Sequence, residues 1–305
     1  MKEVFYFPSS DGVSRLHAIR WAPDGEVRAI LQIVHGMSEH IERYDEFARF
    51  LATRGVLVVG HSHLGHGKSV KCDADLGYFA EPDGNACLIA DIHALRQRTW
   101  AEHKTVPYFI LGHSMGSFLT RQYLGVHGAG LAGAIIMGTS DLPDALVLSA
   151  RKLCTWMASF KGWRHRSKLI DGFIIRGYER RMGMEWLSKN AESTSAYASD
   201  PLCGFAFTLN GYYNFFTGVH RANRQEAAGD IPMGYPILFT AGAEDPVGSN
   251  GRGVEILCRR YRKLGARVKI KLYSGMRHEI LNELDRFTVY EDIYTWMNRS
   301  ESRCI

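Results

Sequence analysis

The chain has 305 residues, of which 46% are hydrophobic and 23% are charged, the balance of an ordinary folded protein with a sizeable core. The 31 Gly and 9 Pro residues are spread along the chain, which excludes collagen-like and low-complexity proteins. A formal net charge of +5 is mildly basic and well short of a dedicated nucleic-acid-binding protein, so no nucleic-acid partner is predicted.

The cysteines and the N-terminal residues bear on the cellular compartment. The six cysteines form no Cys-x-x-Cys pair and no spacing typical of a metal site. The first eight residues include a Glu and a Pro where a signal peptide needs an apolar run. No apolar stretch approaches the roughly 18 residues of a membrane-spanning helix. These features predict a cytoplasmic protein with reduced thiols.

Short apolar runs alternate with segments of helical periodicity along most of the chain. Runs typical of strands lie at residues 4–7, 16–21, 29–34, 56–59, 108–111, 134–137, 237–241 and 268–273. Most are continuous, as in strands buried on both faces of a parallel sheet. Helical periodicity is found at residues 44–54, 88–100, 117–126, 254–264 and 280–297. The alternation predicts an α/β fold with a mostly parallel central sheet flanked by helices.

One long stretch interrupts this alternation. Residues 142–231 contain helical and loop-like segments rich in Trp, Tyr, Phe and Arg, without a convincing buried strand. Because the stretch stands between two clear strands, we expect an insertion into one domain. The predicted organisation is a core of residues 1–141 and 232–305 with an inserted helical cap, residues 142–231.

The sharpest chemical signal is Gly112-His113-Ser114-Met115-Gly116, which directly follows a predicted strand and precedes a predicted helix. The bare pattern is weak, but this strand–turn–helix context is the one in which a nucleophilic serine is found. The flanking glycines allow a tight turn that lifts the hydroxyl above the sheet. Ser114 is therefore the predicted nucleophile, and a plain Gly-rich connection is the alternative.

A serine hydroxyl becomes an effective nucleophile only when a base takes its proton. His278 is the predicted base because it lies in the loop after the last predicted strand. His113, next to the serine, is expected to pack in the fold. A carboxylate should orient the imidazole, and Asp245 follows the strand at residues 237–241, which places it at the same edge of the sheet. Glu244 and Asp141 are the rival carboxylates.

Three further histidines, His61, His63 and His66, share the loop after the strand at residues 56–59 and raise the alternative of a transition-metal site. No Asp or Glu lies among them, so an ordinary loop is favoured. We therefore predict no metal and no other cofactor.

Attack on an acyl carbon creates an oxyanion, which needs N–H donors already in position. The backbone N–H of Met115, directly after the nucleophile, is one predicted donor. The N–H of Met37 is the other, because Gly36 before it lets the backbone approach closely. Glu39 is expected to have a structural role at the N-terminus of the next helix.

Five stretches carry a specific resemblance. They read His-Gly-Met-Ser-Glu-His-Ile-Glu-Arg-Tyr (35–44), Gly-His-Gly-Lys-Ser (65–69), Gly-His-Ser-Met-Gly (112–116), Ala-Glu-Asp-Pro-Val (243–247) and Arg-His-Glu-Ile-Leu-Asn-Glu (277–283). Over nearly the whole chain apart from the insert, they resemble the monoacylglycerol lipase and lysophospholipase (serine aminopeptidase-like) branch of the α/β-hydrolases. The resemblance implies a triad of Ser114, Asp245 and His278, with Met37 and Met115 as oxyanion donors. The family usually has Asp-His-Arg where this chain has Ser-His-Leu (62–64), so no loop salt bridge is expected there.

In such a fold the insert would cover the nucleophile. Its aromatic residues either line an apolar tunnel for an acyl chain or form a small helical core. Five residues of the chain are predicted to contact substrate: Gly36, Phe205, Phe207, Tyr212 and Phe215.

The insert also has an unusual charge distribution. Residues 151–181 hold nine Lys or Arg against two acidic residues, interleaved with Trp156, Phe160 and Trp163. A basic helix with apolar residues on its other side suits an anionic membrane surface, and a solvated charged face is the alternative. We therefore expect peripheral contact of this segment with anionic lipid.

These features together predict a cofactor-free serine hydrolase that cleaves carboxylic esters with lipid-like acyl chains through an acyl-enzyme on Ser114. A hydrolase of another acyl bond, such as a small peptide or amide, and an acyltransferase are alternatives on the same triad. A non-catalytic ligand-binding protein on a hydrolase fold is an alternative from another class.

Overall fold

The computed structural model describes residues 1–174, 176–231 and 233–301. Pro232 at the predicted boundary of the insert and Ile175 in the predicted basic segment lie outside the described residues.

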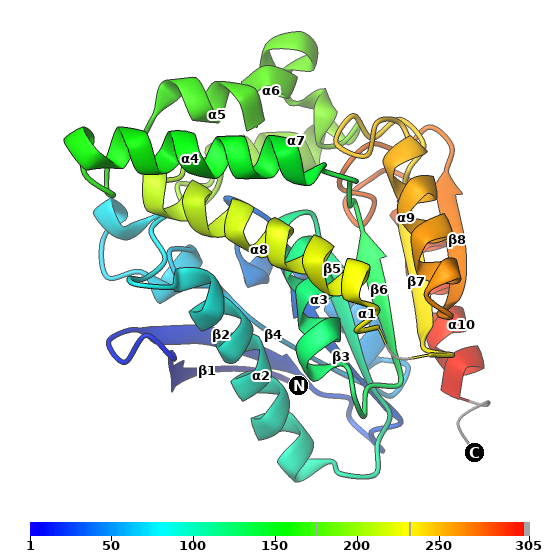
Figure 1. Ribbon diagram of the computed structural model, residues 1–305. Helices are drawn as coiled ribbons and strands as arrows, with labels where there is room; N and C mark the ends of the chain where they lie inside the picture. The colour runs from blue at the N-terminus through cyan, green and yellow to red at the C-terminus, as the bar shows by residue number, and fades with distance from the viewer. Residues whose placement is uncertain (175, 232, 302–305) are drawn as a thin grey trace.

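An eight-stranded sheet in the described part of the chain has the order β1-β2-β4-β3-β5-β6-β7-β8 (Figure 1). β2 runs antiparallel to β1 and β4, and the other neighbouring strands are parallel. The strands are β1 (Lys2–Pro8), β2 (Arg15–Trp21), β3 (Ala29–Val34), β4 (Val56–His61), β5 (Tyr108–His113), β6 (Gly133–Met137), β7 (Pro236–Gly242) and β8 (Arg267–Tyr273). The predicted α/β fold with a mostly parallel sheet is confirmed.

Helices cover both faces of the sheet. On one face lie α1 (Asp45–Ala52) and α10 (Arg286–Glu301), and on the other lie α2 (Gly84–Glu102), α3 (Met115–His127) and α9 (Arg252–Lys263). β3 shows why its residues form a central strand: Ile30 and Val34 belong to one hydrophobic cluster, and Leu31 and Ile33 belong to the cluster on the opposite face. The strand, apolar except for the buried Gln32, is thus covered on both sides.

Two sequence-based predictions need correction. β8 is not buried on both faces: it is an edge strand in which exposed Arg267, Lys269 and Lys271 alternate with half-buried apolar residues. Charged side chains on an edge also hinder pairing with another chain. The last helix does not begin at residue 280. It begins at Arg286, because the preceding loop carries Glu279 and Glu283 into contacts with other segments.

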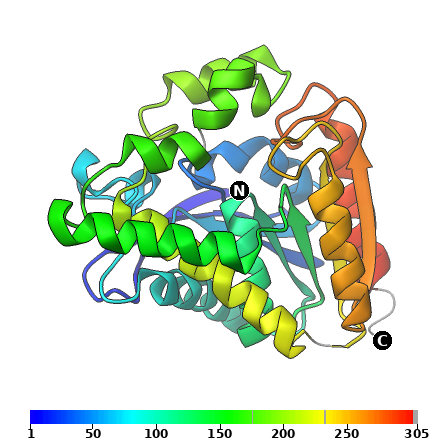
Figure 2. The same ribbon diagram turned by 45° about the horizontal axis from the view of Figure 1, so that its top comes forward.

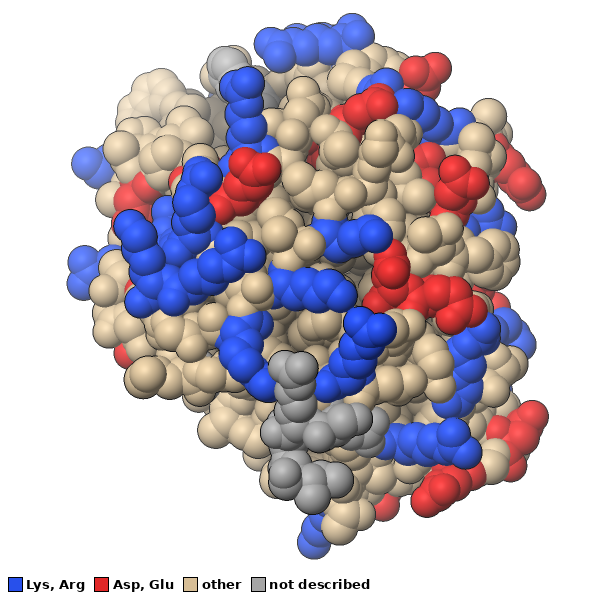
Figure 3. All heavy atoms as spheres, turned by 90° about the vertical axis from the view of Figure 1, so that its right-hand side faces the viewer, with Lys and Arg blue, Asp and Glu red and all other residues tan. Residues whose placement is uncertain are grey.

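Basic side chains gather on the face formed by α9 and β8, which Figure 3 shows. Residues 252–271 contain eight Lys or Arg against one Glu. The chain outside the insert is nearly neutral in total, but its charge is therefore not evenly spread.

The segment between β6 and β7 is helical, as predicted. Helices α4 (Asp144–Lys161), α5 (Lys168–Ile174), α6 (Arg176–Met182) and α7 (Ala191–Ser199), with the 3-10 helix η4 (Gly183–Trp186), lie above the edge where the parallel strands end (Figures 1 and 2). The long helix α8 (Leu209–Ala228) then returns to the core and packs against both α4 and α3. The division between core and cap at residues 142 and 231 stays a prediction. None of the described helices is both long and apolar enough to cross a membrane.

Candidate active site

Ser114 stands between the end of β5 and the first residue of α3, in a strained turn. Its backbone has φ 52° and ψ −119°, a region that residues other than glycine rarely adopt. A Cβ on Gly112 would come 2.3 Å from the carbonyl oxygen of Gly116, and one on Gly116 would come 1.9 Å from that of Val34. The two glycines are therefore needed for close packing of β5, α3 and β3, and the turn lifts the hydroxyl out of the sheet.

The structure brings the predicted nucleophile, base and carboxylate together. Nδ1 of His278 lies 3.0 Å from Oδ2 of Asp245, and Nε2 lies 2.9 Å from Oγ of Ser114. An ionised carboxylate only accepts hydrogen bonds, so Nδ1 carries the proton and Nε2 is free to accept from the serine hydroxyl. Asp245 is fully buried, and its other oxygen accepts the N–H of Val247, which fixes its orientation.

The rival carboxylates point elsewhere. Glu244 pairs with Lys189 at 2.9 Å near the surface, and Asp141 pairs with Arg260 at 2.8 Å. Asp245 is thus the one of the three proposed carboxylates that contacts His278.

The surroundings of His278 favour its protonated form. Burial by itself lowers the pKa of an imidazole, but the charge and hydrogen bond of Asp245 outweigh it, with further help from Glu279 and Glu39. The pKa of His278 is therefore raised above its usual value of 6.5. Such a group is poised to take a proton from Ser114.

The loop after β3 brings Gly36 and Met37 next to the serine. A Cβ on Gly36 would lie 3.1 Å from Cβ of Ser114, so only glycine fits there without displacement. Met37 and Met115 both line the cavity that contains Ser114. Met115 is the first residue of α3, so its N–H has no partner within the helix and can point to a developing oxyanion.

Glu39 has a different structural role from the one expected at a helix N-terminus. Its Oε1 accepts hydrogen bonds from the backbone N–H of Gly36 at 2.6 Å and from the hydroxyl of Tyr44 at 2.8 Å. Its Oε2 pairs with Arg43, whose guanidinium also binds both oxygens of Glu279 at 2.6 and 2.7 Å. This buried network joins the loop before α1 to the loop that carries His278.

Electrostatics keep this network charged. Burial would raise the pKa of Glu39, but the hydrogen bond from His113 and the charge of Arg43 hold it well below its usual range. His113, which was expected to pack, lies with Nδ1 3.2 Å from Glu39 Oε1.

Ser38 anchors the same loop from the other side. It has φ 53°, its hydroxyl donates to the carbonyl of Phe205 at 2.7 Å, and its carbonyl accepts from Gly204 N–H and Tyr197 hydroxyl. The segment after α7 therefore holds the loop that carries Met37 in place.

Ser114 and His278 open onto a cavity of about 470 Å³, within the usual range for small-molecule sites. Its walls are mostly apolar and come from α4, α5, α6 and α8 as well as the core. They include Phe118, Leu142, Leu146, Val147, Ala150, Leu153, Ile170, Ile174, Tyr178, Trp186, Phe215 and Phe216.

Of the five predicted substrate-binding residues, Gly36 and Phe215 line this cavity. The others lie elsewhere among the described residues. Phe207 is fully buried and packs edge-on against His66 at 5.2 Å, and Phe205 contacts the same ring at 5.4 Å. The hydroxyl of Tyr212 donates to Asp171. These three aromatic residues of the insert pack in or against the hydrophobic core.

His61, His63 and His66, together with His35, pack ring against ring, with centroids 4.1 Å apart for His35 and His63 and 4.9 Å apart for His61 and His63. Burial lowers their pKa values, to about 4 for His35 and about 3 for His61 and His66. His66 Nε2 accepts the N–H of Ser38 at 3.3 Å. These four histidines, of which His61 ends β4, are thus neutral packing groups that support the loop after β3.

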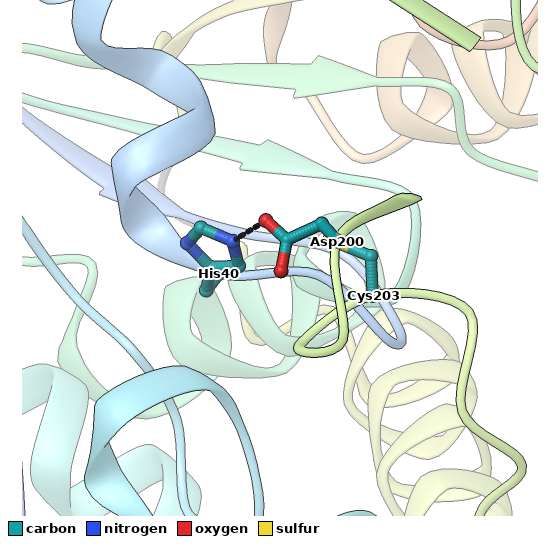
Figure 4. Close-up of side chains that lie close together, drawn as sticks. All are labelled: His40, Asp200 and Cys203. Carbon is teal, nitrogen blue, oxygen red and sulfur yellow. Dashed lines mark hydrogen bonds and ion pairs between the residues drawn. The ribbon is translucent and has the colours of Figure 1, made fainter. Parts of the chain in front are cut away.

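A different group of donor atoms comes within reach of a metal ion among the described residues: His40, Asp200 and Cys203 (Figure 4). His40 Nε2 lies 2.8 Å from Asp200 Oδ2, and the other Asp200 oxygen accepts the N–H of Leu202. These bonds satisfy the carboxylate within the protein. The group therefore connects the loop after β3 to the segment after α7.

Sequence analysis missed three contributors to the site: Arg43, Glu279 and Trp186. Arg43 and Glu279 form the charged link described above, and Trp186 stacks on the His278 ring at a centroid distance of 5.4 Å. Arg43 and Glu279 lie within the stretches 35–44 and 277–283 that carry the family resemblance, and this position could have identified them as site residues. Nothing in the local pattern around Trp186 distinguishes it from the other aromatic residues of the insert.

Comparisons with known proteins identify the family of the chain. The family model described as "Serine aminopeptidase, S33" matches residues 25–285. The chain is 26% identical over 285 residues to the monoacylglycerol lipase of Mycolicibacterium smegmatis, covering 91% of this chain and 90% of that protein. It is 25% identical over 299 residues to the monoglyceride lipase of Rattus norvegicus, covering 93% and 88%.

Solved structures show the same architecture. A highly thermostable carboxyl esterase from Bacillus coagulans, solved in complex with glycerol, superposes with a TM-score of 0.89 at 28% identity, covering 97% of this chain and 98% of that one. A soluble variant of monoglyceride lipase from Saccharomyces cerevisiae shares the fold, with a TM-score of 0.79 at 19% identity over 98% and 95% of the two chains. The chain therefore belongs to the serine aminopeptidase S33 family of α/β-hydrolases, as an esterase- and lipase-like member.

Proposed function

We propose that this protein hydrolyses carboxylic esters with lipid-like acyl chains, in the manner of a monoacylglycerol lipase, lysophospholipase or carboxylesterase. One observation carries the proposal: the Ser114 Oγ and His278 Nε2 pair, 2.9 Å apart, opens onto a mostly apolar cavity. An acyl chain fits against the apolar walls while its ester carbonyl lies beside Ser114.

In the proposed reaction, His278 Nε2 takes the hydroxyl proton of Ser114 while Oγ attacks the acyl carbon. The carbonyl oxygen becomes an oxyanion and accepts hydrogen bonds from the N–H groups of Met37 and Met115. Protonated His278, stabilised by Asp245, then gives its proton to the leaving alcohol as the C–O bond breaks. A water molecule attacks the acyl-enzyme with His278 again as base, which releases the acid and restores Ser114.

The substrate class draws support from the relatives. The names of the mycobacterial and rat proteins point to a monoglyceride, and the Bacillus structure points to simple carboxylic esters. A monoglyceride with a medium or long acyl chain is the substrate we favour within the broader ester class.

The test is hydrolysis of p-nitrophenyl esters with acyl chains of increasing length, followed by a monoglyceride and a lysophospholipid. Ser114→Ala should lower kcat by on the order of 10⁶. A fluorophosphonate probe should label the wild type and not this variant. Full activity in Ser114→Ala excludes the mechanism, and an unlabelled wild type favours a non-catalytic ligand-binding protein.

An aminopeptidase is the alternative that the family description raises. A free α-amino group would need an unpaired carboxylate in the site. Glu39 and Glu279 line the cavity, but both already bind Arg43. We therefore expect esters to be cleaved and amino-acid p-nitroanilides not to be. Faster cleavage of the anilides would reverse this assignment.

We further propose that α4 and α5 touch an anionic membrane surface. Lys152, Trp156 and Phe160 follow one another at four-residue spacing along one stripe of α4. Trp156 and Phe160 are 64% and 55% exposed, and Leu169 on α5 is 56% exposed. Large exposed apolar side chains beside Lys are typical of interfacial helices.

Part of the basic segment serves the fold instead. Arg164 pairs with Asp75, Arg166 donates to the carbonyl of Leu76, and Arg151 donates to the hydroxyl of Tyr213. The exposed lysines Lys152, Lys161 and Lys168 remain to meet lipid phosphates.

Liposome flotation with and without anionic lipid tests this contact. Trp156→Ser/Phe160→Ser and Lys152→Glu/Lys161→Glu should each reduce binding to anionic vesicles. Lys263→Glu/Lys269→Glu, a matched charge change on the α9 and β8 face, should leave binding intact. Equal binding by all variants argues against the proposed surface.

A further inference from the structure

The imidazole of His278 is covered by an aromatic side chain from the insert. The rings of Trp186 and His278 have centroids 5.4 Å apart and planes 29° apart, a stacked arrangement. Tyr178 stacks on Trp186 in turn, at 5.6 Å and 27°. Trp186 is buried and lines the cavity beside Ser114. One face of the proposed base thus lies against an indole rather than water.

The backbone keeps these two rings together. His278 N–H donates to the carbonyl of Trp186 at 3.4 Å, and Glu279 N–H donates to the carbonyl of Leu187 at 2.7 Å. Further along the loop, the side chain of Glu283 accepts from the Ser188 hydroxyl at 2.9 Å and from the backbone N–H of Lys189 at 3.0 Å. The segment after η4 is therefore bound along the His278 loop, and the stacked geometry is built into the fold.

The indole has a chemical consequence because His278 carries a positive charge in each half of the proposed reaction. The face of an aromatic ring is negative and attracts a cation near its centroid, most strongly for Trp and when water is excluded. An apolar side chain of similar size would exclude water equally but would not stabilise the charge.

We propose that Trp186 is a positioning residue for His278. Its indole holds the imidazole in line with Ser114 and stabilises the protonated imidazole through the face of the ring. The inference rests on the proposed function and deepens it. It makes the insert part of the acid–base machinery in addition to a wall of the cavity.

Other groups also face His278. Asp245 contacts Nδ1 at 3.0 Å, Glu279 and Glu39 act through their charges, and the ring of His113 lies 4.9 Å away. A substitution at Trp186 leaves all of these in place, so the contribution of the indole can be measured separately.

The test compares the pKa of His278 in wild type, Trp186→Phe and Trp186→Leu by NMR titration of the imidazole signals, with His278→Asn to assign the resonance. Leu keeps the contact apolar but has no ring. We expect the pKa to fall by about 0.5 to 1 unit in Trp186→Leu and by less in Trp186→Phe. Trp163→Leu changes another tryptophan of the insert, whose ring packs at a tilt against Tyr213, and should leave the pKa of His278 unchanged.

Kinetics on a p-nitrophenyl ester should agree. We expect Trp186→Leu to lower kcat about three- to tenfold with KM little changed, and Trp186→Phe to recover most of the loss. An unchanged His278 pKa in a folded Trp186→Leu protein overturns the inference, whatever happens to kcat. If Leu prevents folding, as judged by circular dichroism, Trp186→Met supplies the same comparison.

The two proposals fail separately. The NMR titration needs no substrate, so it answers for Trp186 even if no ester is hydrolysed. Loss of fluorophosphonate labelling in Ser114→Ala answers for the proposed function alone.

Discussion

The carboxylate of Glu39 accepts a hydrogen bond of 2.6 Å from the backbone N–H of Gly36, three residues before it. The bond folds the loop after β3 back on itself beside Ser114, where Gly36 has no room for a side chain. The Arg43 guanidinium ties the same carboxylate to Glu279, next to His278. One buried anion thus connects the proposed oxyanion loop with the loop of the proposed base.

We expect Glu39→Ala to lower kcat about 10- to 100-fold with a small change in KM, because a displaced Met37 N–H mainly weakens binding of the transition state. Glu39→Gln keeps a carbonyl oxygen for Gly36 and should lose less. Steady-state kinetics on one p-nitrophenyl ester measure both variants. Equal kcat in wild type and Glu39→Ala would show that the loop keeps its shape without this bond.

The activity should fall as the pH falls through the pKa of His278. The imidazole must be neutral to take the proton of Ser114, and its pKa lies above the usual 6.5, mainly because Asp245 outweighs burial. The acid limb of kcat/KM should therefore have its midpoint above pH 6.5. Asp245→Asn should move it to lower pH and reduce kcat by on the order of 10⁴. If the midpoint of the acid limb does not move in Asp245→Asn, the limb reports the titration of a group other than His278.

Removing one partner of the buried ion pair between Arg121 on α3 and Glu226 on α8 should strongly destabilise the fold. Both side chains are fully buried, and Arg121 Nε lies 2.7 Å from Glu226 Oε1. The hydroxyl of Tyr261 donates to the same oxygen. Arg121→Met leaves a buried carboxylate with fewer partners and should reduce the free energy of unfolding by about 3–5 kcal/mol.

Chemical denaturation monitored by circular dichroism measures this change. The double variant Arg121→Met/Glu226→Met should recover much of the loss, because it buries no unpaired charge. This account of the pair would be contradicted if the double variant lost more free energy of unfolding than the two single variants together.

The stability should fall as the pH falls below about 6.5. His35, His61, His63 and His66 are buried and neutral in the fold, with pKa values lowered by burial. The unfolded chain binds protons at these groups from about pH 6.5 downward and the folded chain does not, so unfolding becomes easier with acid. At pH 5, each imidazole should lower the free energy of unfolding by on the order of 1–2 kcal/mol. His278, with its raised pKa, acts in the opposite direction.

Denaturant titrations at pH 8, 6.5 and 5 follow this change. His61→Phe, which replaces a fully buried ring with an apolar one, should flatten the pH dependence between the two lower values. The same slope in this variant would exclude His61 from the effect.

The amino-acid sequence determined the features that depend on neighbours along the chain. Strands such as β3 and β5 could be predicted because a run buried on both faces is mostly apolar, with Gln32 and His113 as the polar exceptions. The turn around Ser114 is readable because only glycine fits at 112 and 116. The order of the loops then indicated which histidine and carboxylate lie at the same edge of the sheet.

The tertiary structure decided what depends on contacts between distant segments. Phe207 and Tyr212 look like pocket residues by type, but Phe207, just before α8, and Tyr212, on α8, pack into the core. Phe215, also on α8, lines the cavity. β8 alternates apolar residues with Arg and Lys, and its place at the edge of the sheet leaves the charged side chains exposed.

The contacts of the proposed site follow the same division. Arg43 and Glu279 meet across 236 residues of chain, and Trp186 contacts His278 from the insert. No periodicity or spacing encodes which side chains face one another across such distances, because packing of whole helices and loops selects them. The reacting residues of the proposed site could thus be predicted from local sequence, whereas the buried contacts that hold them in place are defined only in the folded molecule.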